Sequence, residues 1–207
     1  VDGSLKRLGT DYLDVLLLHR PDALMEPEEV AEAFDELEKS GKVRHFGVSN
    51  EDPYTMELLQ SALHQPICAN QLQMSLTNAT MIAQPMNTNI CDGLNPVLDN
   101  GVLNYCRLHN ITIQTWSPFQ YGFFEGVFIG SEKYPKLNAK LDELAEKYNV
   151  TNTAIALAWI LRHPAKMQAV TGTINPKRLR DCAAALDITL AREDWYALYL
   201  AAGYRLP

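Results

Sequence analysis

The chain has 207 residues, 47% hydrophobic and 21% charged, which is typical of a folded domain with a substantial buried core and disfavours disorder. Its formal net charge of -7 comes from acids and bases interleaved along the sequence, so we expect neither DNA nor RNA as a partner. The apolar runs are far shorter than the roughly 20 residues that a membrane span needs, so we expect no membrane span.

Short apolar runs alternate with segments of helical period, which is the pattern of βα units around a parallel sheet. Residues 12–19 predict a buried strand, and the helix after it begins near Pro27 and ends before Gly41. Residues 43–49 predict a second strand, which leads through Asp52 and proline into a second helix.

The same rhythm continues to the end of the chain. Further strands are predicted at residues 68–73, 111–117 and 167–172. Helices are predicted at residues 97–108, 153–161, 178–186 and 193–201. Residues 76–94 and 119–135 interrupt the rhythm and predict two long loops, which are either functional lids or ordinary insertions. We interpret residues 1–207 as a single domain.

The predicted strands do not suffice for a closed barrel. Five strands cannot complete an eight-stranded barrel, and an open parallel sheet would leave long edges unpaired. We therefore expect an α/β chain that is part of a larger (β/α)8 TIM barrel. A complete doubly wound sheet is the alternative, but its first strand should lead into a glycine-rich turn, and residues 19–22 read His-Arg-Pro-Asp.

Polar residues recur where the predicted strands end, which is where catalytic residues lie in barrels of this kind. These strand ends contain His19, Ser49, Asn50, Gln71, Gln73, Trp116, Ser117, Gly172 and Thr173. The segments around them are LLLHRPD, GKVRHFGVSN, ANQLQ, TWSPF and GTINPKRLRD. In order and spacing they resemble the aldo-keto reductases, closest to a bacterial branch of oxidoreductases. The resemblance assigns them to strands 4 to 8 of that barrel and implies that its N-terminal strands 1 to 3 are lacking here. The resemblance implies reduction of a small aldehyde or ketone to an alcohol by hydride transfer from NADPH.

The resemblance places His19 at the active-site histidine that orients the substrate carbonyl. A neutral imidazole can donate a hydrogen bond to the carbonyl oxygen and polarise it as hydride reaches the carbon. The family's proton-donating tyrosine, the lysine that lowers its pKa and a supporting aspartate belong to strands expected before Val1, and no residue here matches them. By itself the chain is therefore expected to be inactive.

The resemblance assigns the nicotinamide carboxamide to Ser49, Asn50 and Gln71, whose hydroxyl and amides can satisfy an amide's donors and acceptor. Trp116 matches an aromatic residue that stacks on the nicotinamide ring. The residues after it, expected near the pyrophosphate, are Ser117, Pro118 and Phe119.

A last cluster matches the segment that binds the 2′-phosphate of NADP(H). Thr173, a helix start and Arg178 can together bind a phosphate. Gly172 stands where many relatives have a lysine, and Cys182 where an asparagine that contacts adenine is common. The preference for NADPH over NADH therefore stays open.

Three functional interpretations remain open. The first is an enzyme completed by an upstream segment. The second is a cofactor-binding regulatory or interaction subunit of the same fold, which upstream catalytic residues would distinguish from the first. The third is an inactive half-barrel that self-associates through its open sheet edges.

The four cysteines, at positions 68, 91, 106 and 182, are far apart and show no CxxC spacing. This spacing argues against a zinc site and against a disulfide framework, and it favours a reducing, cytoplasmic setting. The chain begins at Val1 without the pattern of a signal peptide, and we expect that an upstream segment is missing.

Overall fold

The computed structural model describes residues 1–88 and 99–207, so Cys91 and the first residues of the helix expected at 97–108 lie outside the described part. The chain forms two compact units. One comprises Val1–Leu72 with Asn104–Ile113, and the other Gln73–Leu103 with Gln114–Pro207. The single domain inferred from the sequence stays a prediction.

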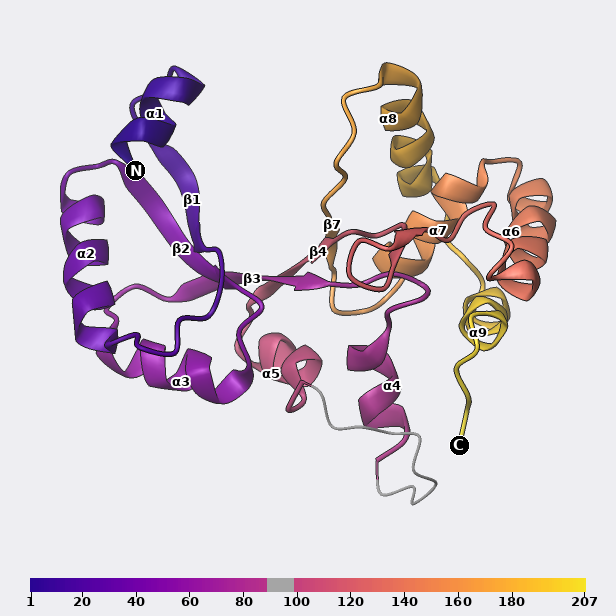
Figure 1. Ribbon diagram of the computed structural model, residues 1–207, viewed down its shortest axis with the longest axis horizontal. Helices are drawn as coiled ribbons and strands as arrows, with labels where there is room; N and C mark the ends of the chain where they lie inside the picture. The colour runs from indigo at the N-terminus through magenta and orange to yellow at the C-terminus, as the bar shows by residue number, and fades with distance from the viewer. Residues whose placement is uncertain (89–98) are drawn as a thin grey trace. The chain divides into compact units, whose positions relative to one another are not determined.

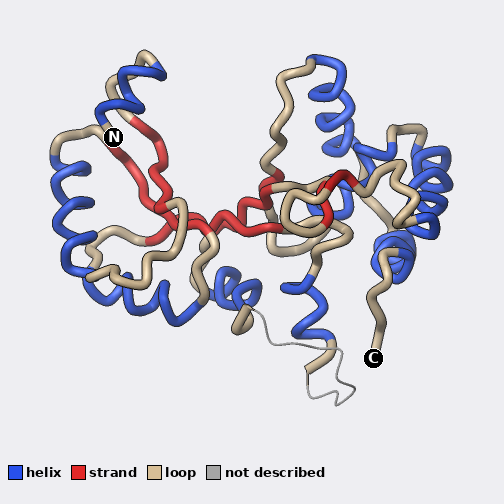
Figure 2. The backbone as a smooth tube through the Cα atoms, viewed as in Figure 1, coloured by secondary structure: helices blue, strands red, loops and turns tan. Residues whose placement is uncertain are grey.

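The first unit contains parallel strands with helices beside them (Figures 1 and 2). The elements that lie wholly or mostly in it are α1 (Asp2–Leu8), β1 (Leu13–Leu18), α2 (Pro27–Lys39), β2 (Val43–Ser49), α3 (Pro53–Ala62), β3 (Ile67–Gln73) and α5 (Val102–Leu108). Strand β1 pairs in parallel with β2, and β2 with β3. The alternation predicted from the sequence is therefore confirmed for these strands.

Local chemistry explains where these elements begin and how they pack. Asp52 precedes α3, and its Oδ1 accepts a hydrogen bond from the amide of Tyr54 at 2.9 Å, which caps the helix. Phe34 of α2 stacks on Phe46 of β2 with 4.0 Å between ring centroids. A Cβ at Gly47 would lie 2.6 Å from the carbonyl oxygen of Ala69, so only glycine permits this approach of β2 to β3.

The second unit holds the remaining elements. They are α4 (Thr80–Met86), β4 (Thr112–Trp116), β5 (Gln120–Tyr121), β6 (Gly126–Val127), α6 (Pro135–Tyr148), α7 (Asn152–Leu161), β7 (Gln168–Ala169), α8 (Pro176–Ala183), the 3₁₀ helix η1 (Ala184–Asp187) and α9 (Arg192–Ala201). Strands β4 and β7 pair in parallel, and β5 and β6 form an antiparallel hairpin.

The core of the second unit lies around α7, whose residues 154–160 are all buried. Trp159 of α7 and Trp195 of α9 stack with 4.9 Å between ring centroids. Each indole N–H donates to the other residue's carbonyl oxygen, at 3.1 and 2.8 Å. Both buried indole N–H groups thus have a hydrogen-bond acceptor, and the pair holds α9 against α7.

The structure corrects several predictions. Residues 76–94 do not form a loop throughout, because α4 lies within them, while residues 89–94 lie outside the described part. The loop expected at 119–135 contains the β5–β6 hairpin. The helices α1 and α6 had not been predicted, β7 is shorter than residues 167–172, and α5 begins at Val102 rather than at residue 97.

Across residues 1–88 and 99–207, none of the helices has both the length and the apolar character needed to cross a bilayer. Within the same ranges, no three His, Cys, Asp or Glu side chains gather as ligands for a metal ion. Cys68, Cys106 and Cys182 are free thiols.

Candidate functional site

Ser49, Asn50 and Gln71 come together where β2 and β3 end. The Ser49 hydroxyl donates to the Gln71 carbonyl oxygen at 2.9 Å, and the Asn50 amide Nδ2 donates to the Ser49 Oγ at 2.9 Å. The Asn50 backbone N–H also donates to the Gln71 carbonyl at 3.1 Å. Asn50 has φ of 60°, a left-handed conformation that asparagine tolerates better than most residues. The side chains of Ser49 and Asn50 therefore lie together beside the backbone of Gln71.

His19 follows the last residue of β1. Leu18 lies opposite Val48 in the parallel register, so His19 comes level with Ser49 on the next strand. Its side chain is exposed. His19 and the polar group around Ser49 thus lie at the same end of their strands, the end at which barrel enzymes carry their active sites.

Two buried residues behind this group were not predicted as part of the site. Asn70 is fully buried, and its Nδ2 donates to the carbonyl oxygen of Glu51 at 2.8 Å, which fixes the backbone just after Asn50. Glu51 is 4% exposed, and its pKa is raised by burial and then by the nearby charge of Asp52. The only sequence signal for Asn70 was its position beside Gln71.

Trp116, in the second unit, ends β4 and lies against aromatic side chains of the β5–β6 hairpin. Its indole stacks on Phe124 with 5.8 Å between centroids and 25° between planes, and meets Phe123 edge-on at 6.4 Å. Ser117 has φ of 53°, and its hydroxyl donates to the Gln120 side-chain oxygen at 3.1 Å. The flanking segment is thus a formed turn.

The other two residues expected near the pyrophosphate also support this turn. Pro118 is buried, and the Phe119 carbonyl oxygen accepts a hydrogen bond from the amide of Phe128 at 3.0 Å. Gln73, a predicted strand-end residue, and Ser75 and Thr77, which had not been singled out, donate to carbonyl oxygens of the hairpin at 2.8, 2.8 and 3.1 Å respectively. Nothing in the sequence indicated these contacts.

The expected phosphate-binding segment surrounds the start of α8. Asn175 caps the helix, since its Oδ1 accepts from the amides of Lys177 and Arg178 at 2.9 and 3.3 Å. Thr173 belongs to the same turn, because its hydroxyl oxygen accepts a hydrogen bond from the backbone N–H of Asn175 at 3.2 Å. These helix-start amides are already bonded, so a bound phosphate would depend mainly on side chains.

Lys177 and Arg178 differ in what their side chains do. The Lys177 ammonium pairs with Asp181 one turn along at 3.0 Å. The exposed Arg178 guanidinium has no hydrogen-bond or ion-pair partner among residues 1–88 and 99–207. Cys182 is buried at 9% exposure, and burial followed by the charge of Asp181 raises its pKa. Of the two cations in the first turn of α8, Arg178 is therefore the one available to an anion.

On the expectation that this segment binds the 2′-phosphate of NADP(H), replacing Gly172 by lysine should strengthen NADPH binding by about tenfold relative to NADH. A Cβ at Gly172 would meet no atom within 4 Å, so the side chain fits without displacing the fold. Its ammonium can add a charge-assisted contact to the 2′-phosphate, worth about 1.4 kcal/mol. Titration calorimetry with both cofactors measures the effect. Gly172→Gln is the neutral control, and an equal gain in that variant would show that bulk rather than charge is responsible.

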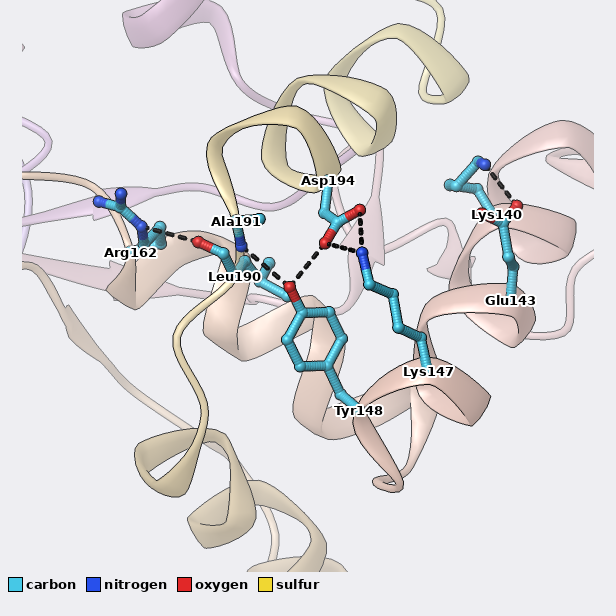
Figure 3. A network of polar contacts seen from close by, with 8 residues as sticks. All are labelled: Lys140, Glu143, Lys147, Tyr148, Arg162, Leu190, Ala191 and Asp194. Atoms are coloured by element: carbon cyan, nitrogen blue, oxygen red, sulfur yellow. Dashed lines mark hydrogen bonds and ion pairs between the residues drawn. The ribbon is translucent and has the colours of Figure 1, made fainter.

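The structure also brings a tyrosine, a lysine and an aspartate together, between α6 and α9 (Figure 3). The Tyr148 hydroxyl donates to Asp194 at 2.6 Å and accepts from the Ala191 amide at 2.9 Å, while the Lys147 ammonium donates to both Asp194 oxygens at 3.0 and 2.7 Å. Burial and the bond to Asp194 raise the pKa of Tyr148. These bonds join Lys147 and Tyr148 of α6 to Asp194 of α9, and we interpret the cluster as a structural link that secures α9.

Asp194→Asn is expected to lower the free energy of unfolding by about 1–2 kcal/mol at neutral pH, mostly through the half-buried bond from Tyr148, because the Lys147 contact is exposed and screened. Burial alone would raise the pKa of Asp194, but the bonds from Lys147 and Tyr148 outweigh it and lower the pKa. Its stabilisation is therefore complete above the unfolded pKa of about 3.9 and is lost as pH falls through the lower folded value.

Urea unfolding from neutral pH down to about pH 3.5 measures this difference. Glu143→Gln removes the exposed Lys140–Glu143 pair shown in Figure 3 and is the control, with an expected cost below about 0.5 kcal/mol. A cost for Asp194→Asn no larger than that of the control would contradict the assignment of the cluster as a structural link.

Comparison with known proteins places this geometry in a family. The model of the aldo/keto reductase family matches residues 1–199. A 6-dehydroglucose reductase of Agrobacterium fabrum is 38% identical over 98% of this chain and 61% of its own length. An aldo-keto reductase of Schizosaccharomyces pombe, yakc, whose name includes NADP(+), is 26% identical over 92% of this chain and 57% of its own length.

The solved structure of the thermostable aldo-keto reductase Tm1743 with the inhibitor epalrestat aligns with a TM-score of 0.75 and 28% identity, over 97% of this chain and 64% of that one. The fold neighbours are thus aldo-keto reductases, which are barrels of the TIM type. The chain spans 61 to 64% of the length of the first curated relatives that it matches. The match of the family model over residues 1–199 shows that this chain belongs to the aldo/keto reductase family.

Proposed function

We propose that the protein is an NADPH-dependent reductase that converts an aldehyde or ketone to an alcohol. The observation that carries the proposal is the convergence of Ser49, Asn50 and Gln71 at the strand ends of a chain whose residues 1–199 match the family. The name of the fission-yeast relative supports NADP(H) as the cofactor. A cytoplasmic location stays a prediction.

The chemistry of the side chains fits this cofactor. The amides of Asn50 and Gln71, with the Ser49 hydroxyl, have the donors and acceptors to bind the nicotinamide carboxamide. Trp116 offers an aromatic surface to the ring, and the exposed guanidinium of Arg178 suits the 2′-phosphate. Bound NADPH supplies the hydride.

His19 is proposed to act on the substrate. Its exposed imidazole, level with Ser49, can donate a hydrogen bond to the carbonyl oxygen, which gains negative charge as the carbon is reduced. A donor aimed at that oxygen stabilises the transition state more than the ground state. Its role is therefore to orient and polarise the carbonyl.

The alkoxide oxygen also needs a proton. We place the family's tyrosine, lysine and aspartate in the part of the relatives' length that this chain does not span, beyond the 61% covered in the Agrobacterium protein. Two observations support this placement. The raised pKa of Tyr148 makes it unsuited to the role of proton donor. Val15, an apolar residue inside β1, is 42% exposed, as expected of a strand that a further part of the protein covers. The turnover measurements below therefore use the full-length gene product.

NADPH binding is expected to quench tryptophan fluorescence through Trp116. The other two tryptophans, Trp159 and Trp195, are 0% and 8% exposed and stack on each other, so only the half-buried Trp116 can meet a ligand. Trp116→Leu should remove the quenching. Quenching that survives the substitution undiminished would show that the nicotinamide does not lie at Trp116.

Turnover is measured as NADPH oxidation with a panel of aliphatic and aromatic aldehydes. One relative is named 6-dehydroglucose reductase, so a sugar-derived carbonyl compound belongs in the same panel. Reduction of any member supports the proposal. NADPH binding without turnover by the full-length gene product would instead favour a cofactor-binding regulatory subunit.

A further inference from the structure

Asn50 occupies a strained position in the turn between β2 and α3. Its φ of 60° is left-handed, and outside glycine such a conformation persists where surrounding contacts enforce it. Asn50 directly follows the last residue of β2 and stands two residues before Asp52, which caps α3. The direction of the Asn50 side chain therefore depends on what holds the short stretch of backbone between these two elements.

Strand β3 holds this backbone on both sides of Asn50. On one side the Asn50 N–H donates to the carbonyl oxygen of Gln71 at 3.1 Å. On the other side the carbonyl oxygen of Glu51 accepts a hydrogen bond from Nδ2 of Asn70 at 2.8 Å. Two consecutive residues of one strand thus fix the backbone on either side of Asn50, and all four residues lie in the first compact unit.

Asn70 has a costly side chain for its position. It is fully buried, and its Nδ2 also lies 3.5 Å from Sδ of Met56 on α3. Its Oδ1 is buried and has no hydrogen-bond partner among residues 1–88 and 99–207. A buried oxygen without a donor is unfavourable for folding, and an apolar side chain would avoid it. The packing of β3 on α3 therefore gives no reason for an amide here, whereas the hydrogen bond to Glu51 does.

The side chain of Asn50 is aligned with that of Ser49. Its Nδ2 donates to the Ser49 Oγ at 2.9 Å, and the Ser49 hydroxyl donates to the Gln71 carbonyl oxygen, also at 2.9 Å. A rotation of the Asn50 backbone would move this amide away from the hydroxyl, because a short side chain follows the backbone that carries it. The arrangement of the two side chains therefore depends on the backbone conformation that Asn70 helps to hold.

We infer that Asn70 is a positioning residue for the nicotinamide, because it holds Asn50 in its left-handed conformation and so directs the Asn50 amide toward the carboxamide of the cofactor. The inference rests on the proposed function, which assigns that carboxamide to Ser49, Asn50 and Gln71. Asn70 has no exposed surface with which to touch a ligand. Its contribution to binding passes through Asn50, which distinguishes it from a residue that only stabilises the fold.

Asn70→Leu removes the donor and keeps most of the side-chain volume. Titration calorimetry with the full-length gene product compares two ligands, NADP+ and 2′-phospho-ADP-ribose, which is NADP+ without its nicotinamide. The substitution should weaken NADP+ binding by about fivefold to tenfold, the loss expected for one hydrogen bond, and leave 2′-phospho-ADP-ribose binding within about twofold. If the protein does not accommodate leucine, Asn70→Ala gives the same comparison.

A double-variant cycle tests whether the effect passes through Asn50. Asn50→Gly removes the amide, and glycine adopts the left-handed conformation without strain. In the Asn50→Gly background, Asn70→Leu should change NADP+ affinity by less than about twofold, because the group that it positions is gone. Loss by the same factor in both backgrounds would overturn the inference, as would unchanged NADP+ affinity in Asn70→Leu or equal weakening of the two ligands.

Met56→Leu is the control variant. It alters the other contact of the Asn70 amide, conserves the side-chain volume and keeps the bond from Asn70 to Glu51. Affinity for both ligands should stay within about twofold of the parent. A loss of NADP+ affinity as large as in Asn70→Leu would overturn the inference, because the packing between β3 and α3, and not the hydrogen bond, would then position the site.

Failure of the proposed function would look different from failure of this inference. If the parent binds NADP+ but reduces no carbonyl compound, the proposed reductase activity falls, and the affinities still decide the role of Asn70. If the parent reduces carbonyl compounds and Asn70→Leu keeps its NADP+ affinity, only the inference falls. A parent that does not bind NADP+ would defeat both.

Discussion

Replacement of Arg178 by alanine is expected to weaken NADPH binding by about 10- to 100-fold and to leave NADH binding within about twofold. The guanidinium lies in the first turn of α8 and has no partner among residues 1–88 and 99–207, so it can turn to the 2′-phosphate without breaking an existing contact. A charge-assisted hydrogen bond contributes about 1.5–3 kcal/mol, and NADH lacks the group that receives it.

Arg180→Ala is the matched control for this prediction. Arg180 is an exposed arginine on the same helix, so the variant loses the same charge two residues away. Titration calorimetry at two salt concentrations should show that only Arg178→Ala changes the ratio of NADPH to NADH affinity. Equal weakening of both cofactors would mean that Arg178 contacts the adenine or supports the loop.

Strong local signals explain which elements could be predicted from the sequence. Strand β2 was predicted with its observed bounds because a glycine precedes it and Asp52 with its following proline ends the turn after it. The helix α7 was found within a residue because its apolar run is continuous. In both elements, the local conformational preference of the sequence agrees with the tertiary packing, so such elements can be predicted without a structure.

Helices α6 and α4 were not predicted from the sequence, for different physical reasons. Helix α6 carried a readable pattern, with Pro135 at its first turn and buried Leu137, Leu141 and Leu144 at helical spacing, but the glycine-rich segment before it obscured its start. Helix α4 is short, polar and contains Pro85, so its own sequence disfavours it. Its buried Met81 and Ile82 show that packing supplies the stability that propensity does not.

The candidate site divides in a similar way. The side chains at the strand ends could be predicted because parallel strands place their carboxyl ends at one edge, and the bond from Ser49 to Gln71 follows from that register. The environment of Trp116 could not be predicted. It depends on a turn in which Gly122 and Phe124 both have positive φ, and on donors from residues more than forty positions away in sequence, such as Gln73. Contacts of that range leave no local pattern.

Replacement of His19 by alanine in the full-length gene product is expected to lower kcat by about 100-fold or more, which is the loss typical of removing one donor to a developing oxyanion. KM should rise far less, because the bond strengthens as charge develops on the carbonyl oxygen. NADPH affinity should stay unchanged, since the cofactor is assigned to Ser49, Asn50 and Gln71. His19→Gln keeps a neutral N–H donor and should recover part of the loss.

His64→Ala serves as the control, because His64 is an exposed histidine between α3 and β3, away from the strand ends. Steady-state kinetics with one reactive aldehyde, together with NADPH titration of each variant, separates the possibilities. A variant His19→Ala with normal kcat and raised KM would make His19 a binding residue that acts equally on ground and transition states. Loss of NADPH binding in that variant would place His19 at the cofactor, because a group that only polarises the carbonyl has no contact through which it could hold the dinucleotide.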